Sequence, residues 1–142
     1  MDPSPLKNVG ALIYSVATKR YLFLLRNTTK FSGTWGLAGG RVEWGEDLLS
    51  SLTREISEEL SVDLVNAKVI PIEKFTSENH KFTYHTFLIP VENEFVPVLN
   101  SEHRGYCWVG LSDYPHPLHP GLKRTVNFDV ILDKIRTLES IL

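Results

Sequence analysis

Three glutamates, Glu55, Glu58 and Glu59, are the residues of this chain whose type and spacing best suit chemistry. On an α-helix they would share an arc of roughly 100°, because residues at i, i+3 and i+4 lie on one face. Like charges at this spacing repel one another by a few tenths of a kcal/mol. We expect Arg54 to point away from this arc, so that it does not separate the carboxylates. A hard divalent cation such as Mg²⁺, which prefers oxygen ligands, would turn the repulsion into coordination.

A cluster of glutamates also has a simpler explanation, since such residues are common on the solvated faces of helices. The spacing of the surrounding residues favours the metal-binding interpretation. Gly40 is followed at a fixed distance by Glu46, then by the pair Arg54-Glu55, and the stretch ends at the apolar Val62.

This pattern resembles the Nudix box, the signature of the Nudix hydrolase family. Every charged position and every spacing of the box is present between Gly40 and Val62, and the one departure is Ser61, where the family usually has glycine. Ser61 lies where the helix should end, so the departure affects a C-terminal turn that favours glycine. The resemblance implies an α/β fold over nearly the whole chain, a Nudix-type α/β/α sandwich with a mixed β-sheet between helices.

The resemblance also implies a set of metal ligands. Glu58 and Glu59 match ligands of the family, and the backbone carbonyl of Gly39 matches a third. Glu55 either binds a metal or acts as the general base. Glu102 precedes a strand that contains an aromatic residue and a valine, as does an acid that reaches the metals or the attacking water in several Nudix hydrolases. Glu102 therefore competes for the role of base, and an exposed loop glutamate is the alternative.

Other residues of the box and its surroundings have supporting roles in this interpretation. Arg26, at the end of a predicted strand, and Arg41 are candidates for contacts with substrate phosphates, although Arg26 is equally well explained as a solvated strand end. Glu46 and Arg54 are two helical turns apart and would pair to hold the loop against the helix. Gly40 lets backbone groups approach a metal or phosphate without a Cβ in the way.

Hydrophobic patterning predicts the elements that position these residues. The β-prone runs 8–16 and 21–26 predict a β-hairpin, and 27–36 has the composition of a loop. The central helix should begin near Glu46-Asp47. Its apolar residues recur at intervals of three and four and should pack inward. These residues are Leu48, Leu49, Leu52, Ile56 and Leu60.

The second half of the chain is predicted to contain more strands and a closing helix. The segments 62–73 and 81–91 are rich in β-branched and aromatic residues, and 102–109 is a further strand. The segment 111–121 contains three prolines and should be a loop. Apolar residues at helical intervals predict an amphipathic helix over 126–142.

Two groups of residues allow more than one interpretation. Tyr84 and His85 lie in a predicted strand, where core packing is the default and contact with a nucleotide base or sugar is the alternative. His116 and His119 lie close together in the proline-rich loop. Two histidines suggest metal binding, but without another Cys or His beside them a substrate rim or a solvated loop is favoured.

Composition bounds the class of protein. The chain of 142 residues suits one domain over 1–142, with residues 1–7 as a flexible tail. Its net charge of −2 argues against bulk attraction to nucleic acid. A lone Cys107 cannot form an internal disulfide, and we expect a cytoplasmic protein without a signal peptide. No apolar run approaches the 18 or so residues that span a bilayer. The sequence leaves open whether the protein forms a homodimer.

The leading functional hypothesis is therefore a Mg²⁺-dependent pyrophosphohydrolase, in which Mn²⁺ can substitute. A small-molecule nucleotide is the expected partner, with a nucleoside or deoxynucleoside triphosphate as the first choice. A nucleotide sugar of the ADP-ribose or GDP-sugar type is the runner-up. A non-catalytic nucleotide sensor is the rival from another class, and it should have lost box acids that are all present here.

Overall fold

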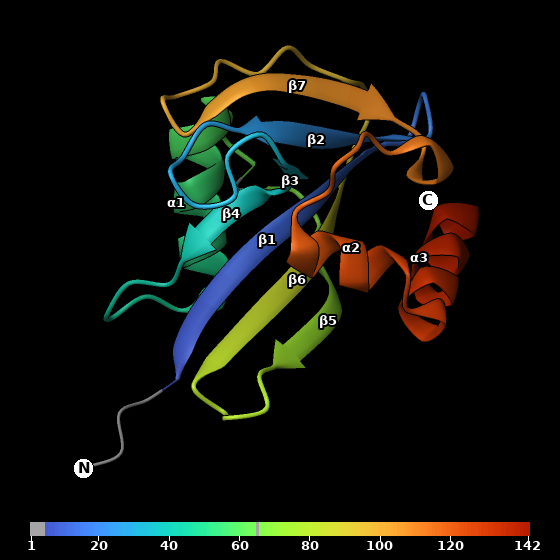
Figure 1. Ribbon diagram of the computed structural model, residues 1–142. Coiled ribbons are helices and arrows are strands. Elements are labelled where there is room, and N and C mark those ends of the chain that lie inside the picture. Colours follow the sequence, from blue (N-terminus) through green and yellow to red (C-terminus); the bar gives the residue numbers. More distant parts are fainter. Residues whose placement is uncertain (1–4, 65) are drawn as a thin grey trace.

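The computed structural model describes residues 5–64 and 66–142, and a mixed seven-stranded β-sheet forms its centre (Figure 1). The strand order is β3-β2-β1-β6-β5, with β4 paired to β1 and β7 paired to β2. The strands are β1 (Leu6–Ser15), β2 (Arg20–Arg26), β3 (Trp35–Gly36), β4 (Ala38–Arg41), β5 (Ile70–Thr76), β6 (Phe82–Val91) and β7 (His103–Val109).

Strand β1 organises the sheet. It pairs antiparallel with β2 across a short turn, which confirms the predicted hairpin. It also pairs in parallel with β6 along its whole length, from the pair Leu6–Phe82 to the pair Ser15–Val91. Strands paired in parallel need a long crossover connection, and this one contains α1 (Leu48–Leu60).

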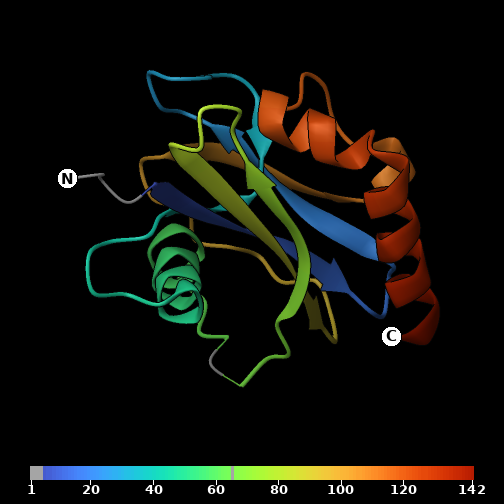
Figure 2. The ribbon, with the colours of Figure 1, turned by 90° about the horizontal axis from the view of Figure 1, so that it is seen from below.

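Helices cover both faces of the sheet. Helix α1 lies on one face, and α2 (Pro120–Val126) and α3 (Asp129–Ile141) lie on the other (Figure 2). Alternate residues of β1 explain this arrangement, because Ala11 and Ile13 pack in the same cluster as α1, whereas Leu12 packs with α2 and α3. The predicted α/β/α sandwich is confirmed. None of the described helices is both long and apolar enough to cross a membrane.

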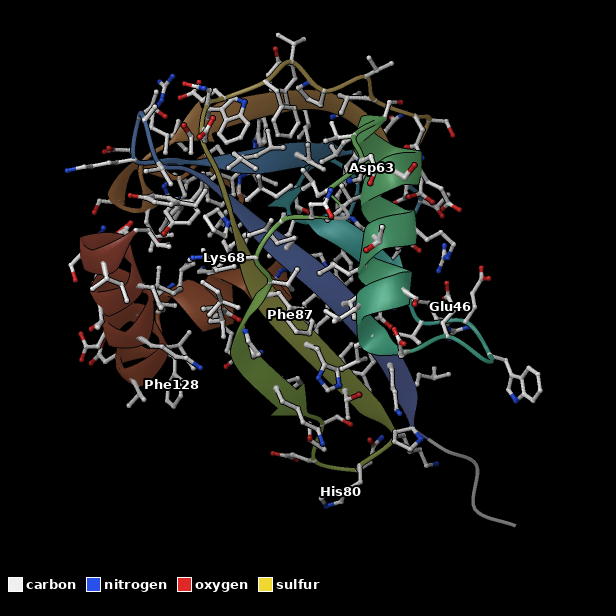
Figure 3. All side chains as sticks on the ribbon, turned by 180° about the vertical axis from the view of Figure 1, so that it is seen from behind. Glu46, Asp63, Lys68, His80, Phe87 and Phe128 are labelled. Atoms are coloured by element: carbon white, nitrogen blue, oxygen red, sulfur yellow. The ribbon has the colours of Figure 1, made fainter. Side chains whose placement is uncertain are left out.

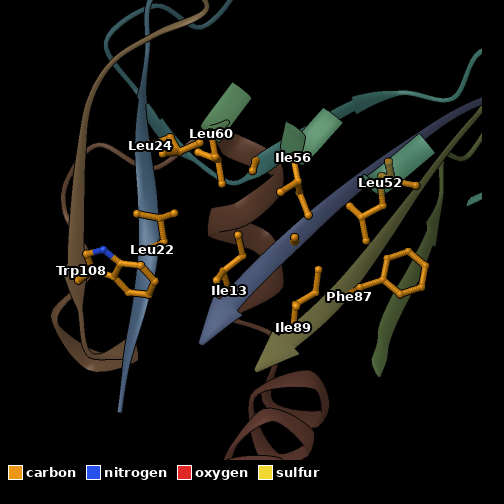
Figure 4. Packing of buried hydrophobic residues seen from close by; sticks show 12 residues of the cluster. Ile13, Leu22, Leu24, Leu52, Ile56, Leu60, Phe87, Ile89 and Trp108 are labelled. Atoms are coloured by element: carbon orange, nitrogen blue, oxygen red, sulfur yellow. The ribbon is translucent and has the colours of Figure 1, made fainter. Parts of the chain in front are cut away.

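Helix α1 begins where the sequence predicts. The Asp47 side chain accepts a hydrogen bond from the Ser50 backbone N–H at 2.7 Å and caps the first turn. Three apolar residues anchor the helix against the sheet in the close view of Figure 4, namely Leu52, Ile56 and Leu60. Leu49 was predicted on the same stripe, but it is 54 % exposed because the helical rotation carries it to the solvent side.

Several predicted boundaries are wrong. The strand predicted over 62–73 begins only at Ile70, although residue 65 lies outside the described residues. The loop predicted over 27–36 ends in β3, and β1 begins at Leu6, inside the predicted tail 1–7, of which residues 1–4 lie outside the described residues.

The closing helix predicted over 126–142 is α3, which begins at Asp129, and a helix that was not predicted, α2, precedes it. Helix α2 begins at Pro120, inside the predicted loop 111–121, and a short 3-10 turn occupies residues 111–113. Proline is well suited to the first turn of a helix, where its missing N–H is not needed, so its presence there did not exclude a helix. Asn127 and Phe128 separate α2 from α3.

Ser61 ends α1 in the left-handed region, with φ 57° and ψ 39°. Its N–H donates to the carbonyl of Ser57 at 3.0 Å, and its hydroxyl donates to the carbonyl of Val98 at 3.3 Å. A Cβ in this region crowds the following carbonyl, and glycine avoids that cost.

We therefore expect Ser61→Gly to stabilise the protein by about 0.5–1 kcal/mol, after the loss of the hydroxyl contact. Ser61→Ala is the matched control, because it loses the same hydroxyl and keeps the strain, and it should destabilise. Urea unfolding curves measure both changes. Equal stabilities of the glycine and alanine variants would contradict the assignment of strain to this residue.

Candidate active site

Three carboxylates meet at the end of α1. One oxygen from each of Glu55, Glu59 and Glu102 lies within 4.8 Å of the others. Glu59 is 1 % exposed and Glu55 is 8 % exposed, whereas Glu102 is open to solvent. The structure thus brings together three of the acids that the sequence had singled out, Glu55, Glu59 and Glu102, from two distant segments.

The chain positions Glu102 through the backbone. Its carbonyl accepts a hydrogen bond from the Asn27 N–H at 2.8 Å, which ties it to the end of β2. Its N–H donates to the Asn100 side chain at 3.0 Å. Strands β2 and β7 pair from Tyr21–Val109 to Arg26–His103. This pairing brings Glu102, the residue before β7, to the end of α1.

Two glycines of β4 form the other side of the cluster. The Gly39 N–H donates to Glu59 Oε1 at 2.7 Å. A Cβ on Gly40 would lie 2.5 to 2.7 Å from the carboxylate atoms of Glu55, closer than real Cβ contacts allow. Glycine at position 40 is therefore needed for Glu55 to occupy this place.

Burial governs the ionisation of the cluster. The pKa of Glu59 is raised to about 10, mainly by desolvation and then by a hydrogen bond with the Glu102 carboxyl, and only the Gly39 N–H opposes the rise. Desolvation also raises the pKa of Glu55, with the neighbouring Arg54 guanidinium opposing it. Among the described residues, no Lys or Arg forms an ion pair with Glu59, so its charge has no protein counterion.

Arg54 links the helix to the preceding loop. Its Nε donates to Glu46 Oε2 at 2.7 Å, as predicted, and its Nη2 donates to the Arg41 carbonyl at 3.1 Å. The hydrogen bond from Arg54 is the main reason that the pKa of Glu46 falls to about 2. Glu46 lies beside the first turn of α1 (Figure 3).

The expectation that Arg54 points away from the acidic arc is wrong. Its Nη1 donates to Glu55 Oε1 at 3.0 Å and to Glu58 Oε2 at 3.2 Å. A guanidinium has five donors spread over a planar fork, and this reach lets one side chain serve both the loop and the helix face. Arg54 therefore offsets part of the repulsion within the acidic arc.

Glu58 lies apart from the three convergent carboxylates. Its side chain is 54 % exposed, and its carboxylate contacts Arg54. Its role as a metal ligand stays a prediction, as does that of the Gly39 carbonyl. In this structure the observed contact of Gly39 with the cluster is made by its N–H.

A pocket of roughly 280 Å³ adjoins the cluster. Gly39 and Gly40 line one part of it, and Arg26 also contributes to its wall. Arg41 is not among the lining residues, its side chain is exposed, and its carbonyl is taken up by Arg54. The acidic cluster and the pocket thus share the two glycines as a common wall.

Aromatic and basic residues that the sequence reasoning did not assign to a site line the rest of this pocket. The Arg124 guanidinium lies 3.7 Å from the centroid of the Phe75 ring. Phe31 packs edge-on against His119, with 4.5 Å between ring centroids. Lys30, which precedes Phe31 in the loop after β2, also lines the pocket.

Only part of this lining had a signal in the sequence. Tyr84 and His119 had been considered as substrate contacts, and both line the pocket. Phe75 lay beyond the predicted end of its strand, and Arg124 lay in a segment without a motif. These two residues meet only because α2 packs over β5 and β6.

Comparisons with known proteins agree with this geometry. The NUDIX domain family model matches residues 5–127. A dihydroneopterin triphosphate diphosphatase of Haemophilus influenzae is 31 % identical over 118 residues, covering 72 % of this chain and 73 % of that protein. The nucleoside triphosphatase NudI of Escherichia coli is 32 % identical over 114 residues, covering 72 % and 80 %.

Solved structures give the same result for the fold. A MutT NUDIX hydrolase from Burkholderia pseudomallei superposes with a TM-score of 0.67 at 25 % identity, covering 87 % of this chain and 97 % of its own. The predicted membership and fold class are both confirmed by these similarities.

The raised pKa of Glu59 makes stability depend on pH and on divalent cations. Between the ordinary value of 4.5 and about 10, the folded state holds a proton at Glu59 that the unfolded chain has released. Stability in EDTA should therefore fall as pH rises through this window. Mg²⁺ should restore it at about pH 8 and do little at about pH 5, because cation and proton compete for the same carboxylates.

Thermal unfolding with Mg²⁺ and with EDTA at both pH values measures this difference. In Glu59→Gln the amide cannot ionise, and both the fall with pH and most of the Mg²⁺ effect should shrink. Equal stabilisation by Mg²⁺ at the two pH values would argue against cation binding at these carboxylates.

Proposed function

We propose, because the chain belongs to the Nudix hydrolase family, that this hydrolase of phosphoanhydride bonds cleaves a nucleoside or deoxynucleoside triphosphate with the aid of Mg²⁺. The products would be a nucleoside monophosphate and pyrophosphate. The observation that carries the proposal is the convergence of Glu55, Glu59 and Glu102 beside a pocket with basic and aromatic walls.

The donor set fits a divalent cation. Three carboxylates within 4.8 Å of one another offer the oxygen ligands that Mg²⁺ and Mn²⁺ prefer, and the buried Glu59 has no protein cation beside it. Glu55 and Glu59 would hold the ion, with Glu58 and the Gly39 carbonyl as further ligands. When bound, such an ion offsets the charge of a diphosphate and lowers the pKa of coordinated water.

The proton of the attacking water requires a base within reach of the phosphates. We assign this role to Glu102, because it is the exposed member of the cluster and Glu55 is engaged by Arg54 at 3.0 Å. Arg26 lines the pocket that adjoins the cluster, where its guanidinium would bind phosphate oxygens and orient the triphosphate.

The pocket supports a triphosphate with one aromatic ring as the substrate. Its volume of roughly 280 Å³ suits a single base and sugar, and the Arg124–Phe75 pair offers a flat surface to a ring. The relatives from Haemophilus influenzae and Escherichia coli carry names of triphosphate hydrolases. A nucleotide sugar would have to place a second sugar outside this volume. We also propose a cytoplasmic location for the protein.

A turnover screen with Mg²⁺ tests the substrate class. Nucleoside triphosphates should give pyrophosphate and a monophosphate, and nucleotide sugars of the ADP-ribose or GDP-sugar type should react far more slowly. Turnover confined to nucleotide sugars would overturn the triphosphate assignment. Binding of a nucleotide without any turnover would support the sensor instead.

Two substitutions test the assigned roles. Glu102→Gln should lower kcat by about 100-fold or more, because the water loses its base, while Mg²⁺ binding falls much less. Glu59→Gln should lower both Mg²⁺ affinity and kcat. Glu78→Gln, in the exposed turn before β6, is the matched control and should leave both unchanged. Full activity of Glu102→Gln would move the role of base to another residue.

A further inference from the structure

We infer that His119 selects the substrate ring, by donating a hydrogen bond from Nε2 to a carbonyl oxygen that uracil and hypoxanthine carry where cytosine and adenine carry an amino group. The inference rests on the proposed triphosphate hydrolase and specifies which rings its pocket accepts. Nothing in the chemistry of the acidic cluster requires His119, so the two assignments are separable.

The backbone fixes which nitrogen of His119 carries the proton. The Gly121 N–H donates to His119 Nδ1 at 3.0 Å, so Nδ1 is an acceptor. A neutral imidazole with an accepting Nδ1 has its hydrogen on Nε2. Burial, then the nearby positive charges of Arg26 and Lys30, lower the pKa of His119 and favour the neutral ring. No described residue accepts a hydrogen bond from Nε2.

The ring is also held in place from several sides. The backbone N–H of His119 donates to the Trp35 carbonyl at 2.8 Å, which ties the start of α2 to β3. The Phe31 ring packs edge-on at 4.5 Å between centroids. His119 lines the pocket, and α2, which it caps, crosses in front of β1 and β6 in Figure 1. A donor fixed in this way loses little freedom when it binds a ligand.

The charges around His119 decide what it can face. The pocket lining includes the donors Arg26, Lys30 and Arg124, and no Asp or Glu is among its described lining residues. Glu73, which contacts two residues of the lining, already accepts from the Thr125 hydroxyl at 2.8 Å and lies 3.6 Å from Arg124. An amino group turned toward His119 would therefore meet other donors, whereas a carbonyl oxygen would be bonded.

A ring is a better partner for His119 than a phosphate. Arg26 is charged and would bind the phosphates, whereas a neutral imidazole is the weaker partner for an anion. The ring of Phe31 packs against His119, and Leu122 also lines the pocket, so His119 has apolar neighbours as well as charged ones. Loss of a phosphate contact would weaken the binding of every substrate equally, whereas loss of a contact with the ring edge would change the discrimination between rings.

His119 also caps α2, and a variant must separate this role from selection. Asparagine is among the best helix-capping residues, and its side-chain oxygen can accept from the Gly121 N–H as Nδ1 does. It is shorter than histidine and does not reach as far into the pocket. His119→Asn thus keeps the cap and withdraws the donor, because its shorter amide N–H₂ does not reach the position of Nε2, and His119→Phe keeps the aromatic packing and removes both cap and donor.

The experiment compares kcat/KM with Mg²⁺ for two matched pairs, UTP with CTP and ITP with ATP. The intact protein should favour the carbonyl member of each pair by about tenfold, the value of one well-placed hydrogen bond. In His119→Asn both ratios should fall to within about twofold of unity, chiefly through KM, with little change in unfolding temperature. In His119→Phe the ratios should fall in the same way.

His85→Gln is the matched control, because His85 lies on β6 between Tyr84 and Thr86 and therefore on the opposite face of the sheet from the pocket. It should leave both ratios unchanged. Turnover of all four nucleotides without a carbonyl preference, or a preference that survives in His119→Asn, would overturn this inference and leave the hydrolase standing. No turnover of any of the four would overturn the triphosphate hydrolase and this inference together.

Discussion

The burial of Glu59 is the constraint on which the site depends. A carboxylate that is 1 % exposed and has no protein cation beside it is costly to ionise, and its pKa rises to about 10. The Gly39 N–H is a single neutral donor and does not offset this cost. Charge can be accumulated here at neutral pH only if a cation arrives to meet it. One carboxylate oxygen each of Glu55 and Glu102 lies within 4.8 Å of one from Glu59, so such a cation would meet three carboxylates.

The sandwich produces this situation through packing. Helix α1 buries its leucine stripe against the sheet, and that contact forces the adjoining face of its last turns toward β4. The absence of a side chain on Gly40 leaves room for the Glu55 carboxylate, and the Gly39 N–H donates to Glu59, so both carboxylates are covered by β4. The same glycines line the pocket on the other side, so a substrate that fills the pocket is brought directly to the acids. Core packing and chemistry thus share one contact between α1 and β4.

The sequence was most informative where function depends on local spacing. Glu55, Glu59 and the pairing of Glu46 with Arg54 follow from intervals along one helix, which the period of 3.6 residues fixes. The role of Glu102 in the cluster required a family landmark, because no local pattern tells which distant loop will reach a helix. The reach of Arg54 to Glu58 was missed, since helical direction alone does not describe a long and flexible side chain.

The pocket that we propose for the substrate was the least predictable part of the structure. Its wall combines residues of the loop after β2, of the strands β1 to β6 and of the seven-residue helix α2, which begins inside the loop predicted over 111–121. The stacking of Arg124 on Phe75 depends on how α2 packs over the sheet, which is a property of tertiary structure and leaves no period in the sequence. The fold class could therefore be predicted from the sequence, but the surface that meets the substrate could not.

The most direct test of the cation site is a crystal structure determined in the presence of Mn²⁺, with anomalous diffraction used to locate the ion. The account predicts an anomalous peak within about 2–2.5 Å of carboxylate oxygens from Glu55 and Glu59, with Glu102 facing it directly or through water. Absence of such a peak, with Glu59 still bonded only to the Gly39 N–H and the other acids turned to solvent, would contradict it.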